Sequence, residues 1–525
     1  MDSTDLIVLW GSNAREAHPI FFHRVLKGID NGAPMFVVDP RRTSSAAWAD
    51  LWLGLDVGSD IALANAVGRE IIHAGLVNEE FVRSATVGFD DYGAAVEPCT
   101  LEWAEGITGV PAVAIAELAH AYGKAPTAQL CWTLGITEHH TGADNVFALI
   151  NLALLTGHVG RYGSGLVPIR GQNNVQGGGD MGALPNKLPG FQDVADDEAR
   201  GKFEARWGSP VPAEPGWHLS EMFDAMDRGD LRALYIIGEN PAQSEADSPH
   251  ARRALGGLDF LAVQDVFLTA TAELADVVFP AATSWAESEG TVTSSERRVQ
   301  RVRRAIDPPG IAKDDREILY ALAARLGHEW GRPSAEETWD ELRSLSPMHT
   351  GMSYDRLEAE GGLQWPCRDE RDPGSLFLHG RLWEDPPRGP LAPFTPVEYA
   401  PPLDELIEEF PIRLTTGRHL DSYNTGVQSG SMPSPLRIGG TIDLSPEDGA
   451  ALGMTDGDSA RVTSRRGSIV TTVRIDPGLR RGLAFMALHY PDDVDINVLT
   501  LDSWDPKSGT SEFKATAVRI ETVGT

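Results

Sequence analysis

The stretch Leu6-Ile7-Val8-Leu9-Trp10-Gly11-Ser12-Asn13 decides the fold of the first part of the chain. Five consecutive apolar residues that end at a turn glycine are typical of a parallel strand covered on both faces. A helix is predicted over residues 19–28, and a second apolar strand over 35–38 ends at Asp39-Pro40-Arg41-Arg42. The strand–helix–strand order predicts a βαβ unit and therefore an α/β fold.

The same design returns in the middle of the chain. A strand is predicted over residues 231–237, a turn at Gly238-Glu239-Asn240-Pro241, a helix over 249–255, and a strand over 260–263 that ends at Gln264-Asp265. The spacing of the marker residues is nearly the same in both parts. The corresponding residues are Gly11 and Gly238, Asp39 and Asp265, and Asp50 and Asp276. Because chance rarely places three marker residues at such similar offsets, we interpret the pattern as an internal duplication of a nucleotide-binding α/β half.

The last part of the chain has a different sequence pattern. Prolines are frequent between residues 386 and 402, and short alternating strands are predicted over 459–464 and 468–475. This pattern predicts a small β-barrel domain. Three domains are therefore expected: a first α/β domain over 1–172, a second α/β domain with interleaved segments over 173–377, and the β-barrel domain over 378–525.

Composition excludes several classes of function. The net charge of −31 argues against nucleic acid as a partner, since duplex binding requires a basic face. It also means that any site for a small anion must be built from local arginines. Cys99, Cys131 and Cys367 form no CxxC pair, so we expect reduced buried thiols and neither a zinc site nor a cysteine-ligated cluster. No membrane-spanning segment and no signal peptide are predicted.

The strand-end acids suggest nucleotide binding. An acid in this position commonly binds ribose hydroxyls or the edge of a base, but neither turn is a GxGxxG motif, so a simple NAD site is not supported. Two halves suit a ligand with two nucleotide arms. On periodicity alone, a structural α/β scaffold with solvated acids explains the pattern equally well. Arg41 and Arg42 beside Asp39 favour the nucleotide interpretation, because they could neutralise phosphates.

The most informative stretch is Val167-Pro168-Ile169-Arg170-Gly171-Gln172-Asn173-Asn174-Val175-Gln176-Gly177-Gly178-Gly179-Asp180-Met181-Gly182. Its glycines allow close approach of a ligand, and its amides offer paired donors and acceptors. Arg170 brings a planar guanidinium of the kind that grips a carboxylate. The alternative is that Arg170 pairs with a buried acid; we favour the carboxylate site because of the neighbouring residues.

This run resembles, almost residue for residue, that of bacterial formate dehydrogenases that use a bis-molybdopterin guanine dinucleotide cofactor. The resemblance continues along the whole chain in Gly11-Ser12-Asn13-Ala14, Asp39-Pro40-Arg41, Gly135-Ile136-Thr137-Glu138-His139, Gly238-Glu239-Asn240-Pro241, Gln264-Asp265, Glu289-Gly290-Thr291, Thr416-Gly417-Arg418 and Asn497-Val498-Leu499-Thr500. It implies two related nucleotide-binding α/β lobes with a C-terminal double-psi-type β-barrel domain. It also implies that formate is oxidised to CO2 at a molybdenum or tungsten site and that two electrons pass to an iron–sulfur relay.

The resemblance assigns roles to individual residues. Arg170 would be the catalytic residue that holds formate. One guanosine arm would be bound by Asn13, Asp39, Arg41 and Asp60. The pterin and the other guanosine would contact Glu138, Gln172, Glu239, Asn240, Gln264, Asp265 and Asp315. The barrel domain would close over the cofactor with Arg418, His419, Tyr423, Asn424, Asn497 and Lys514. The further cofactor neighbours would be Gly11, Gly135, His139, Gly171 and Gly238.

Some features of the family pattern differ here. Glu138 stands where relatives often have glutamine, and Ser294-Ser295 stand where an asparagine is common. The family's 4Fe–4S domain and its metal-bound selenocysteine or cysteine lie before the position of Met1, so no metal ligand is expected in this chain. We therefore expect a separately encoded upstream segment and no activity from this chain alone. Iron–sulfur or flavin subunits are candidate partners, and a cytoplasmic location is expected unless an export signal precedes Met1.

Two other functions remain as alternatives. The first is another reaction on the same cofactor, such as nitrate reduction. The second is a non-catalytic scaffold like the molybdopterin-derived domain of respiratory complex I. The polar cofactor contacts Arg170, Gln172, Asp265, Arg418 and Lys514 argue against a scaffold, because a relic is expected to lose them.

Overall fold

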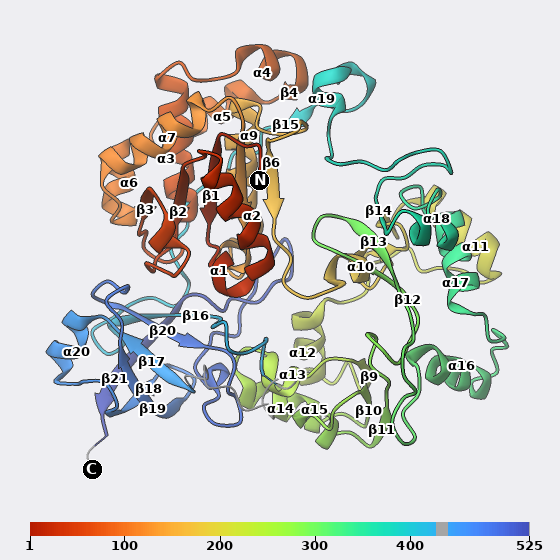
Figure 1. Ribbon diagram of the computed structural model, residues 1–525. Helices are drawn as coiled ribbons and strands as arrows, with labels where there is room; N and C mark the ends of the chain where they lie inside the picture. The colour runs from red at the N-terminus through yellow and green to blue at the C-terminus, as the bar shows by residue number, and fades with distance from the viewer. Residues whose placement is uncertain (427–438, 524–525) are drawn as a thin grey trace. The chain divides into compact units, whose positions relative to one another are not determined.

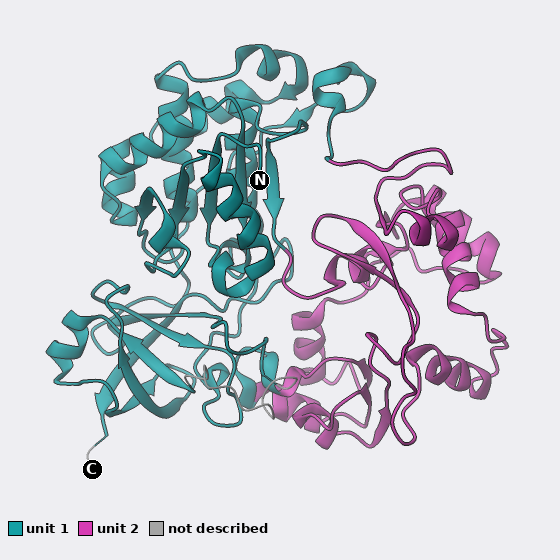
Figure 2. Ribbon diagram, in the orientation of Figure 1, with its two compact units in different colours: residues 1–169, 243–249, 377–525 teal, residues 170–242, 250–376 magenta. Residues whose placement is uncertain are grey.

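The computed structural model describes residues 1–426 and 439–523. The chain divides into two compact units, each of which is described by itself (Figures 1 and 2). Unit 1 comprises Met1–Ile169, Gln243–Pro249 and Phe377–Thr525, and unit 2 comprises Arg170–Ala242 and His250–Leu376. Unit 1 therefore combines the first α/β part with the C-terminal barrel.

A parallel sheet forms the centre of the α/β part of unit 1. Its order is β3-β2-β1-β5-β6. The strands are β1 (Leu6–Trp10), β2 (Met35–Val38), β3 (Leu51–Leu53), β5 (Ala128–Trp132) and β6 (Gly165–Pro168). Because the chain leaves β1 for β2 on one side and later returns to β5 on the other, the strand order reverses between β1 and β5. Ligands of open parallel sheets bind at such a point, beyond the carboxyl ends of the strands.

Helices cover both faces of this sheet, as its continuous apolar strands predict (Figure 1). Ile7 and Leu9 pack with α2 (Pro19–Asp30) on one face. Leu6, Val8 and Trp10 pack on the other face with α3 (Asp60–His73), α7 (Ala112–Lys124) and α9 (Gly142–Thr156). Successive strand residues point to opposite faces, so each of the five strand residues is buried.

The remaining elements of this part are short. They are α1 (Ala14–Ala17), η1 (Ala46–Trp48), α4 (Glu79–Ala85), β4 (Thr86–Val87), α5 (Phe89–Val96), α6 (Leu101–Thr108), α8 (Leu134–Thr137), α19 (Arg381–Glu384), η2 (Pro386–Arg388) and β15 (Ala392–Pro393). The predicted helix over 19–28 is longer than expected and follows the separate helix α1, which begins directly after Asn13. The sequence missed α1 because four helical residues have no apolar periodicity to detect.

The C-terminal part of unit 1 is a closed barrel with the strand order β16-β20-β17-β19-β18-β21. Its strands are β16 (Ile412–Gly417), β17 (Thr441–Leu444), β18 (Ser459–Thr463), β19 (Ser468–Ile475), β20 (Leu483–Ala487) and β21 (Thr516–Thr522), with α20 (Pro446–Leu452) and η3 (Ile496–Val498) between them. Leu414, Ile442, Val462 and Met486 belong to the buried core of the barrel. The predicted barrel domain is confirmed.

Unit 2 contains the second copy of the α/β design. Parallel strands β9 (Ala233–Ile237), β10 (Phe260–Asp265) and β11 (Val277–Pro280) form the sheet β11-β10-β9. Its helices are α12 (Leu219–Asp227), α13 (Pro241–Ser244), α14 (Ser248–Gly256) and α15 (Ala270–Glu273), of which α13 and α14 cross the unit boundary. The small core includes Phe223, Leu255, Leu261 and Val263.

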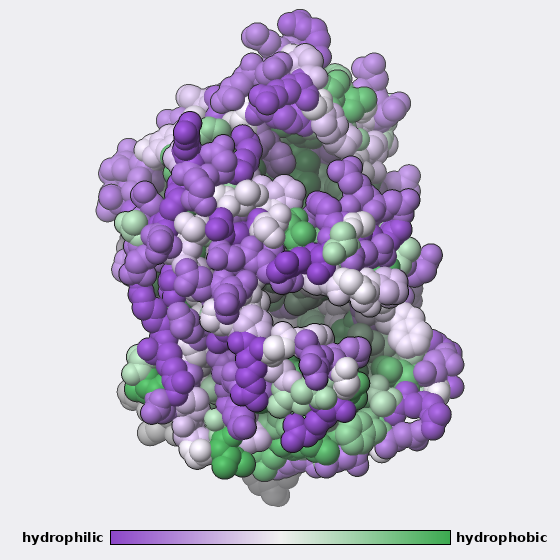
Figure 3. All heavy atoms as spheres, turned by 90° about the vertical axis from the view of Figure 1, so that its right-hand side faces the viewer, coloured by the Kyte–Doolittle hydropathy of each residue, from purple (hydrophilic) through white to green (hydrophobic). Residues whose placement is uncertain are grey.

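The rest of unit 2 surrounds an antiparallel sheet in the order β12-β13-β14. The elements of this part of unit 2 are α10 (Val175–Asp180), β7 (Lys187–Leu188), β8 (Gln192–Asp193), α11 (Asp197–Trp207), β12 (Gly290–Thr293), β13 (Arg298–Val302), α16 (Asp315–Arg325), α17 (Ala335–Leu345), α18 (Tyr354–Ala359) and β14 (Leu363–Gln364). The face in Figure 3 is largely hydrophilic, with hydrophobic side chains gathered mainly toward its lower end. No helix of the described residues is long and apolar enough to cross a membrane.

The internal duplication extends to individual hydrogen bonds. The amide of Gly11 donates to the Val38 carbonyl at 2.8 Å, and that of Gly238 donates to the Gln264 carbonyl at 2.8 Å. In each half this bond ties the first turn to the end of the second strand. Each half also has an acid whose carboxylate accepts from the amide at the start of that strand. These pairs are Asp50 with Met35 at 2.9 Å and Asp276 with Leu261 at 2.8 Å.

The turn asparagines correspond in the same way. Asn13 Oδ1 accepts from the Ser45 hydroxyl at 2.9 Å, and Asn240 Oδ1 accepts from the Thr271 hydroxyl at 2.8 Å. Ser45 and Thr271 each lie six positions after the strand-end acid of their half. The two halves therefore share the bonds that shape the first turn, and the predicted duplication holds at atomic detail.

Candidate functional site

Two glycines lie in contact at the point between β1 and β5 where the strand order of the unit 1 sheet reverses. Gly11 follows β1 with φ of +58°, and Gly135 follows β5. A Cβ on Gly135 would lie 2.3 Å from the Gly11 carbonyl oxygen, closer than real Cβ contacts come. The Thr133 hydroxyl also donates to that oxygen at 2.7 Å. In this structure, these predicted site residues bring two turns together at the carboxyl edge of the sheet.

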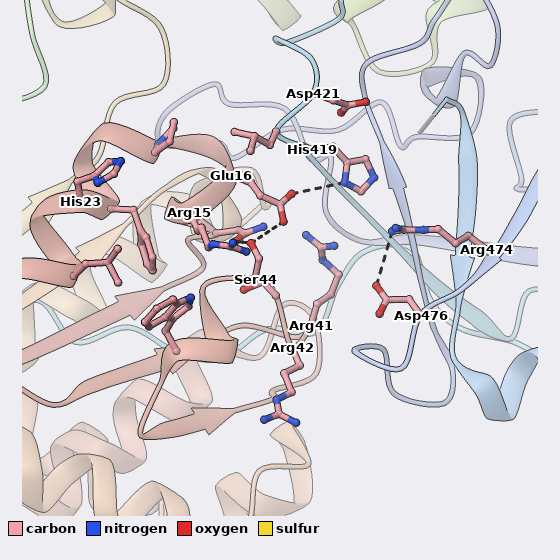
Figure 4. Close-up of a pocket in the computed structure, with 17 residues that line it drawn as sticks. Arg15, Glu16, His23, Arg41, Arg42, Ser44, His419, Asp421, Arg474 and Asp476 are labelled. Atoms are coloured by element: carbon pink, nitrogen blue, oxygen red, sulfur yellow. Dashed lines mark hydrogen bonds and ion pairs between the residues drawn. The ribbon is translucent and has the colours of Figure 1, made fainter. Parts of the chain in front are cut away.

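An open pocket of about 650 Å³ lies beside this edge (Figure 4). Four arginines contribute to its wall: Arg15, Arg41, Arg42 and Arg474. Figure 4 shows Arg41, Arg474 and His419 directed toward a common space, whereas Arg42 points away from it. Glu16, Asp421 and Asp476 line the same pocket, so the four arginines form a basic cluster beside acidic residues in a protein whose net charge is −31. Such a cluster can bind phosphate groups.

Glu16 and Asn13 organise the wall of this pocket. The Ser44 hydroxyl donates to Glu16 Oε1 at 2.7 Å, and Glu16 Oε2 lies 3.7 Å from His419 Nδ1. Burial works against ionisation of Glu16, but the nearby His419 and the hydrogen bond from Ser44 outweigh it and lower the pKa to about 2. Glu16 is therefore an anion that holds His419 and the loop after Arg42 in place.

Arg41 and Arg474 are held by different contacts. The Arg41 guanidinium lies over the ring of Phe485, 3.5 Å from its centroid. Arg474 donates from Nε to Asp443 Oδ1 at 2.8 Å and forms a second bond to the other oxygen. Asp443 is fully buried. Both cations are thus fixed before any ligand binds.

Asp39 directly follows β2 and interacts with Arg41. Asp39 is 8% exposed, and its carboxylate accepts from the Arg41 amide at 2.9 Å. Burial raises the pKa of Asp39 to about 6, against the attraction of Arg41. Ionised Asp39 is therefore costly in the chain by itself, and hydroxyl or N–H donors of a ligand would offset that cost.

The variant Asp39→Asn is expected to stabilise the chain by up to about 3 kcal/mol above pH 6, since the buried charge is removed. A raised folded pKa means that the protonated acid is favoured by folding, so the difference should shrink as the pH falls from 6 toward 3.8. Urea unfolding across this range measures it. The same variant should retain less guanine nucleotide on purification. Asp90→Asn, at an exposed position, provides the control. If Asp39→Asn destabilised the chain at neutral pH, this would contradict the conclusion that the buried charge of Asp39 is costly.

A clasp joins residues 138–144 to residues 504–514 within unit 1. Lys514 Nζ lies 2.8 Å from Glu138 Oε2, and the Lys514 side chain also donates to the Thr416 carbonyl at 3.1 Å. Glu512 Oε1 lies 3.2 Å from His139 Nδ1. The Phe513 amide donates to the Glu138 carbonyl at 3.2 Å. The clasp therefore fixes Glu138 and His139, two of the predicted site residues.

The ion pair of His139 and Glu512 is deeply buried. Burial opposes the charge on both groups, but the attraction of Glu512 raises the pKa of His139, and His139 and His140 keep the pKa of Glu512 low. The His140 amide adds a hydrogen bond to Glu512 Oε2 at 2.9 Å. Burial also raises the pKa of Asp60, and the charge of His139 and a 2.8 Å bond from the Trp10 indole oppose this rise.

Glu512→Gln should destabilise the chain by about 2 kcal/mol, because a charged acceptor for His139 is lost while its shape is kept. The lowered pKa of Glu512 contributes stability above pH 4.5, and the raised pKa of His139 contributes it below pH 6.5. The difference in unfolding free energy between Glu512→Gln and wild type should therefore be largest between pH 4.5 and pH 6.5. Urea midpoints at about pH 5.5 and about pH 9 test this, with the exposed Glu408→Gln as control; equal differences at both pH values would contradict it.

The predicted residues of the barrel part have internal partners. Arg418 bonds to Asn424 Oδ1, and its guanidinium lies 5.1 Å from the centroid of the Tyr423 ring. The His419 amide donates to His489 Nε2 at 2.8 Å. Asn497 donates to the Gln243 carbonyl at 2.9 Å and is almost fully buried. These contacts order the loop 418–424 and leave Asn497 in a supporting position.

The second half gathers its polar residues at the carboxyl edge of its sheet. Gln264 is fully buried and bonds to Tyr235 and Asp315. Asp265 accepts from the Phe267 amide at 3.0 Å. Burial raises the pKa of both Asp265 and Asp315. Where the first half has Arg41 two residues after its acid, this half has Phe267, so the two edges differ in charge.

Gly238, Glu239 and Gln172 are exposed, and Gly171 is partly exposed. No heavy atom lies within 4 Å of a Cβ built on Gly238 or Gly171. These positions could accept a close ligand. Arg170 is also exposed and donates from Nε to Gln176 Oε1 at 3.2 Å. It therefore has a polar partner from its own segment, and Gln176 links it to the buried Asp180.

Sequence reasoning missed several residues that shape the site. Glu16, Glu512 and His489 each contact a predicted residue that lies far away in the sequence, and Arg474 lines the same pocket as Asn13 and Arg41. Only Glu16 carried a local signal, since it lies three positions after Asn13 in a turn. The three cysteines are free and buried, as expected. Among the described residues, no cluster of histidine, cysteine and acids could hold a metal ion.

Comparison with known proteins agrees with this arrangement. The molybdopterin oxidoreductase family model matches residues 1–325, and the molybdopterin dinucleotide binding domain matches residues 412–517. An F420-dependent formate dehydrogenase 2 subunit alpha of Methanococcus maripaludis is 42% identical over 99% of this chain and 76% of its own length. Formate dehydrogenase H of Escherichia coli is 38% identical over 100% of this chain and 73% of its own length.

A solved structure has the same fold. Acetylene hydratase from Pelobacter acetylenicus superposes with a TM-score of 0.76 at 20% identity, covering 100% of this chain and 78% of that one. The match supports the architecture of α/β parts and barrel. With both models matched and the relatives covering the full chain, this protein belongs to the molybdopterin oxidoreductase family.

Proposed function

We propose that this chain is the cofactor-binding and formate-binding part of a molybdopterin-dependent formate dehydrogenase. The observation that carries the proposal is Arg170 in its glycine-rich segment, in a chain that is 37–42% identical over 99–100% of its length to formate dehydrogenase alpha subunits. Formate is small and anionic, and the net charge of −31 disfavours it at long range. A local guanidinium is the group needed to bind it.

The residues present fit the cofactor that the family implies. The first half offers the arginine-lined pocket for phosphates and buried Asp39 for N–H or hydroxyl donors. The second half offers Asp265 and Asp315, whose raised pKa values indicate carboxyl groups short of compensating charge. Two such edges suit a ligand with two guanosine arms. Asn13, Asp39 and Arg41 would hold one arm, and Gln264, Asp265 and Asp315 the other.

The protein's own part in the reaction is to position formate. When bound, the metal–pterin group supplies the two-electron redox chemistry. Arg170 would hold the carboxylate by two hydrogen bonds and orient the C–H bond. Lys514 and Glu138, paired at 2.8 Å, would keep the wall of the site in a fixed polar arrangement. Positioning of this kind raises kcat as well as affinity.

Other parts of the proposal rest on the resemblance. A tungsten ion in place of molybdenum, an iron–sulfur relay and electron-transfer subunits with iron–sulfur or flavin groups are all proposed for the assembled enzyme. A cytoplasmic location is proposed as well. Each of these stays a prediction from the sequence.

A dye-linked assay tests the proposed function. The assembled enzyme, purified with the subunits that accompany this chain, is given formate and an oxidised viologen dye, and separately nitrate with the reduced dye. We expect formate-dependent dye reduction and no nitrate-dependent dye oxidation. Nitrate turnover without formate turnover would replace the proposal by a nitrate-reductase function.

A further inference from the structure

The segment that carries Arg170 is anchored at both ends to the antiparallel sheet of unit 2. The Ser295 hydroxyl donates to the Arg170 carbonyl at 3.3 Å. Asn174, at the start of α10, accepts from the Thr293 amide at 2.9 Å. A Cβ on Gly177 would lie 1.9 Å from Asn174 Oδ1, so a larger residue there would displace the Asn174 side chain. The backbone of Arg170 and helix α10 are thus held together.

A chain of side chains continues from this backbone to the guanidinium. Arg170 Nε donates to Gln176 Oε1 at 3.2 Å, and Gln176 Nε2 donates to Asp180 Oδ1 at 2.9 Å. The Trp365 indole donates to the other Asp180 oxygen at 2.8 Å. Gln176 and Asp180 lie four positions apart on α10 and therefore share one helix face.

The direction of these bonds is determined by Asp180. This side chain is 1% exposed, and an ionised carboxylate can only accept hydrogen bonds. Gln176 must therefore turn its NH₂ group toward Asp180 and its oxygen toward Arg170. Burial raises the pKa of Asp180, while Gln176, Trp365, Arg170 and Arg297 all favour the ionised form.

We propose that Gln176 and Asp180 are positioning residues for Arg170, which set the plane of its guanidinium toward the substrate carboxylate. This inference rests on the proposed formate site. It assigns a role to the polar positions of the glycine-rich segment beyond direct contact with a ligand. This role depends on the orientation of the Gln176 amide, because reversing it would place an NH₂ donor against the Nε–H donor of Arg170.

Asp180→Asn makes that reversal. The Trp365 indole requires an acceptor, so the introduced amide turns its oxygen toward the indole and its NH₂ group toward Gln176. Gln176 must then turn its own oxygen toward that NH₂ group and its own NH₂ group toward Arg170. We expect the formate KM of the assembled enzyme to rise about 10-fold, with a smaller fall in kcat. The affinity of the oxidised enzyme for nitrate, a planar anion measured by calorimetry without a reductant, should fall by a similar factor.

The double variant Asp180→Asn with Gln176→Glu is the decisive case. The introduced carboxylate accepts from both the introduced amide and Arg170, and the net charge of this variant equals that of wild type. We expect formate KM and nitrate affinity to return to within about 2-fold of wild type. Asp355→Asn, on the exposed side of α18, is the matched control and should leave both values unchanged.

The outcomes separate the two proposals. Loss of function in Asp180→Asn without recovery in the double variant overturns the positioning role, provided that both unfold at the wild-type temperature. If Asp180→Asn does not fold, Gln176→Met is used, and unchanged KM and nitrate affinity in that variant overturn the inference. If wild-type enzyme does not oxidise formate, the proposed function fails, while nitrate affinity still reports on the orientation of Arg170.

Discussion

Arg170→Ala is expected to lower kcat/KM for formate by about 100-fold or more in the assembled enzyme. The guanidinium supplies both the binding of the carboxylate and its orientation, so KM should rise and kcat should fall together. Arg170 is exposed, and the stability of the chain should change by less than about 0.5 kcal/mol. Steady-state kinetics with a viologen acceptor, together with a thermal unfolding curve, measure both effects.

The matched control is Arg303→Ala. Arg303 is also an exposed arginine of unit 2, and its ion pair with Glu358 lies at the surface. It should leave kcat/KM unchanged. If Arg170→Ala also leaves kcat/KM unchanged, then Arg170 does not contact formate and the substrate site lies elsewhere in the chain.

Gly135→Ala should destabilise unit 1 by about 3 kcal/mol. The new methyl group would lie 2.3 Å from the Gly11 carbonyl oxygen and 2.7 Å from its Cα. Both atoms are backbone, so they cannot move aside as a flexible side chain can. The turns after β1 and β5 would separate at the carboxyl edge of the sheet, where we propose that the cofactor binds, and we expect purified enzyme to contain little guanine nucleotide. Urea unfolding and nucleotide analysis measure the two effects.

Gly93→Ala serves as control. Gly93 lies in helix α5, and no heavy atom lies within 4 Å of a Cβ built there. Alanine should be neutral or stabilising by up to about 1 kcal/mol in a helix. A Gly135→Ala protein as stable as Gly93→Ala would show that the contact between the two turns is not needed for the fold.

Local sequence patterns predicted most of the architecture. The buried strand at Leu6–Trp10, the matched spacing of Asp39 and Asp265, and the alternating strands near residue 470 correspond to a parallel sheet, its second copy and the barrel. Each of these predictions rests on hydrophobic periodicity, or on marker residues that lie within about 40 positions of one another in the sequence. The family resemblance extended the prediction to the cofactor class.

The supporting contacts could not be predicted in the same way. Glu16 contacts His419, and Glu512 contacts His139, across hundreds of positions. Arg474 sits in an ordinary strand, and only the closed barrel brings it to the pocket of Asn13 and Arg41. Such pairs depend on the packing of separate parts of the chain, which periodicity does not specify. The roles of individual cofactor residues, the three-domain boundaries and the inactivity of the chain alone remain predictions.

The most direct test of the account is the nucleotide and metal content of the purified, assembled enzyme. Acid release of guanine nucleotides, followed by chromatography, is combined with elemental analysis of the same sample. The account predicts about two guanine nucleotides and about one molybdenum or tungsten atom for each copy of this chain. A folded, fully assembled enzyme that contains neither guanine nucleotide nor either metal would contradict it.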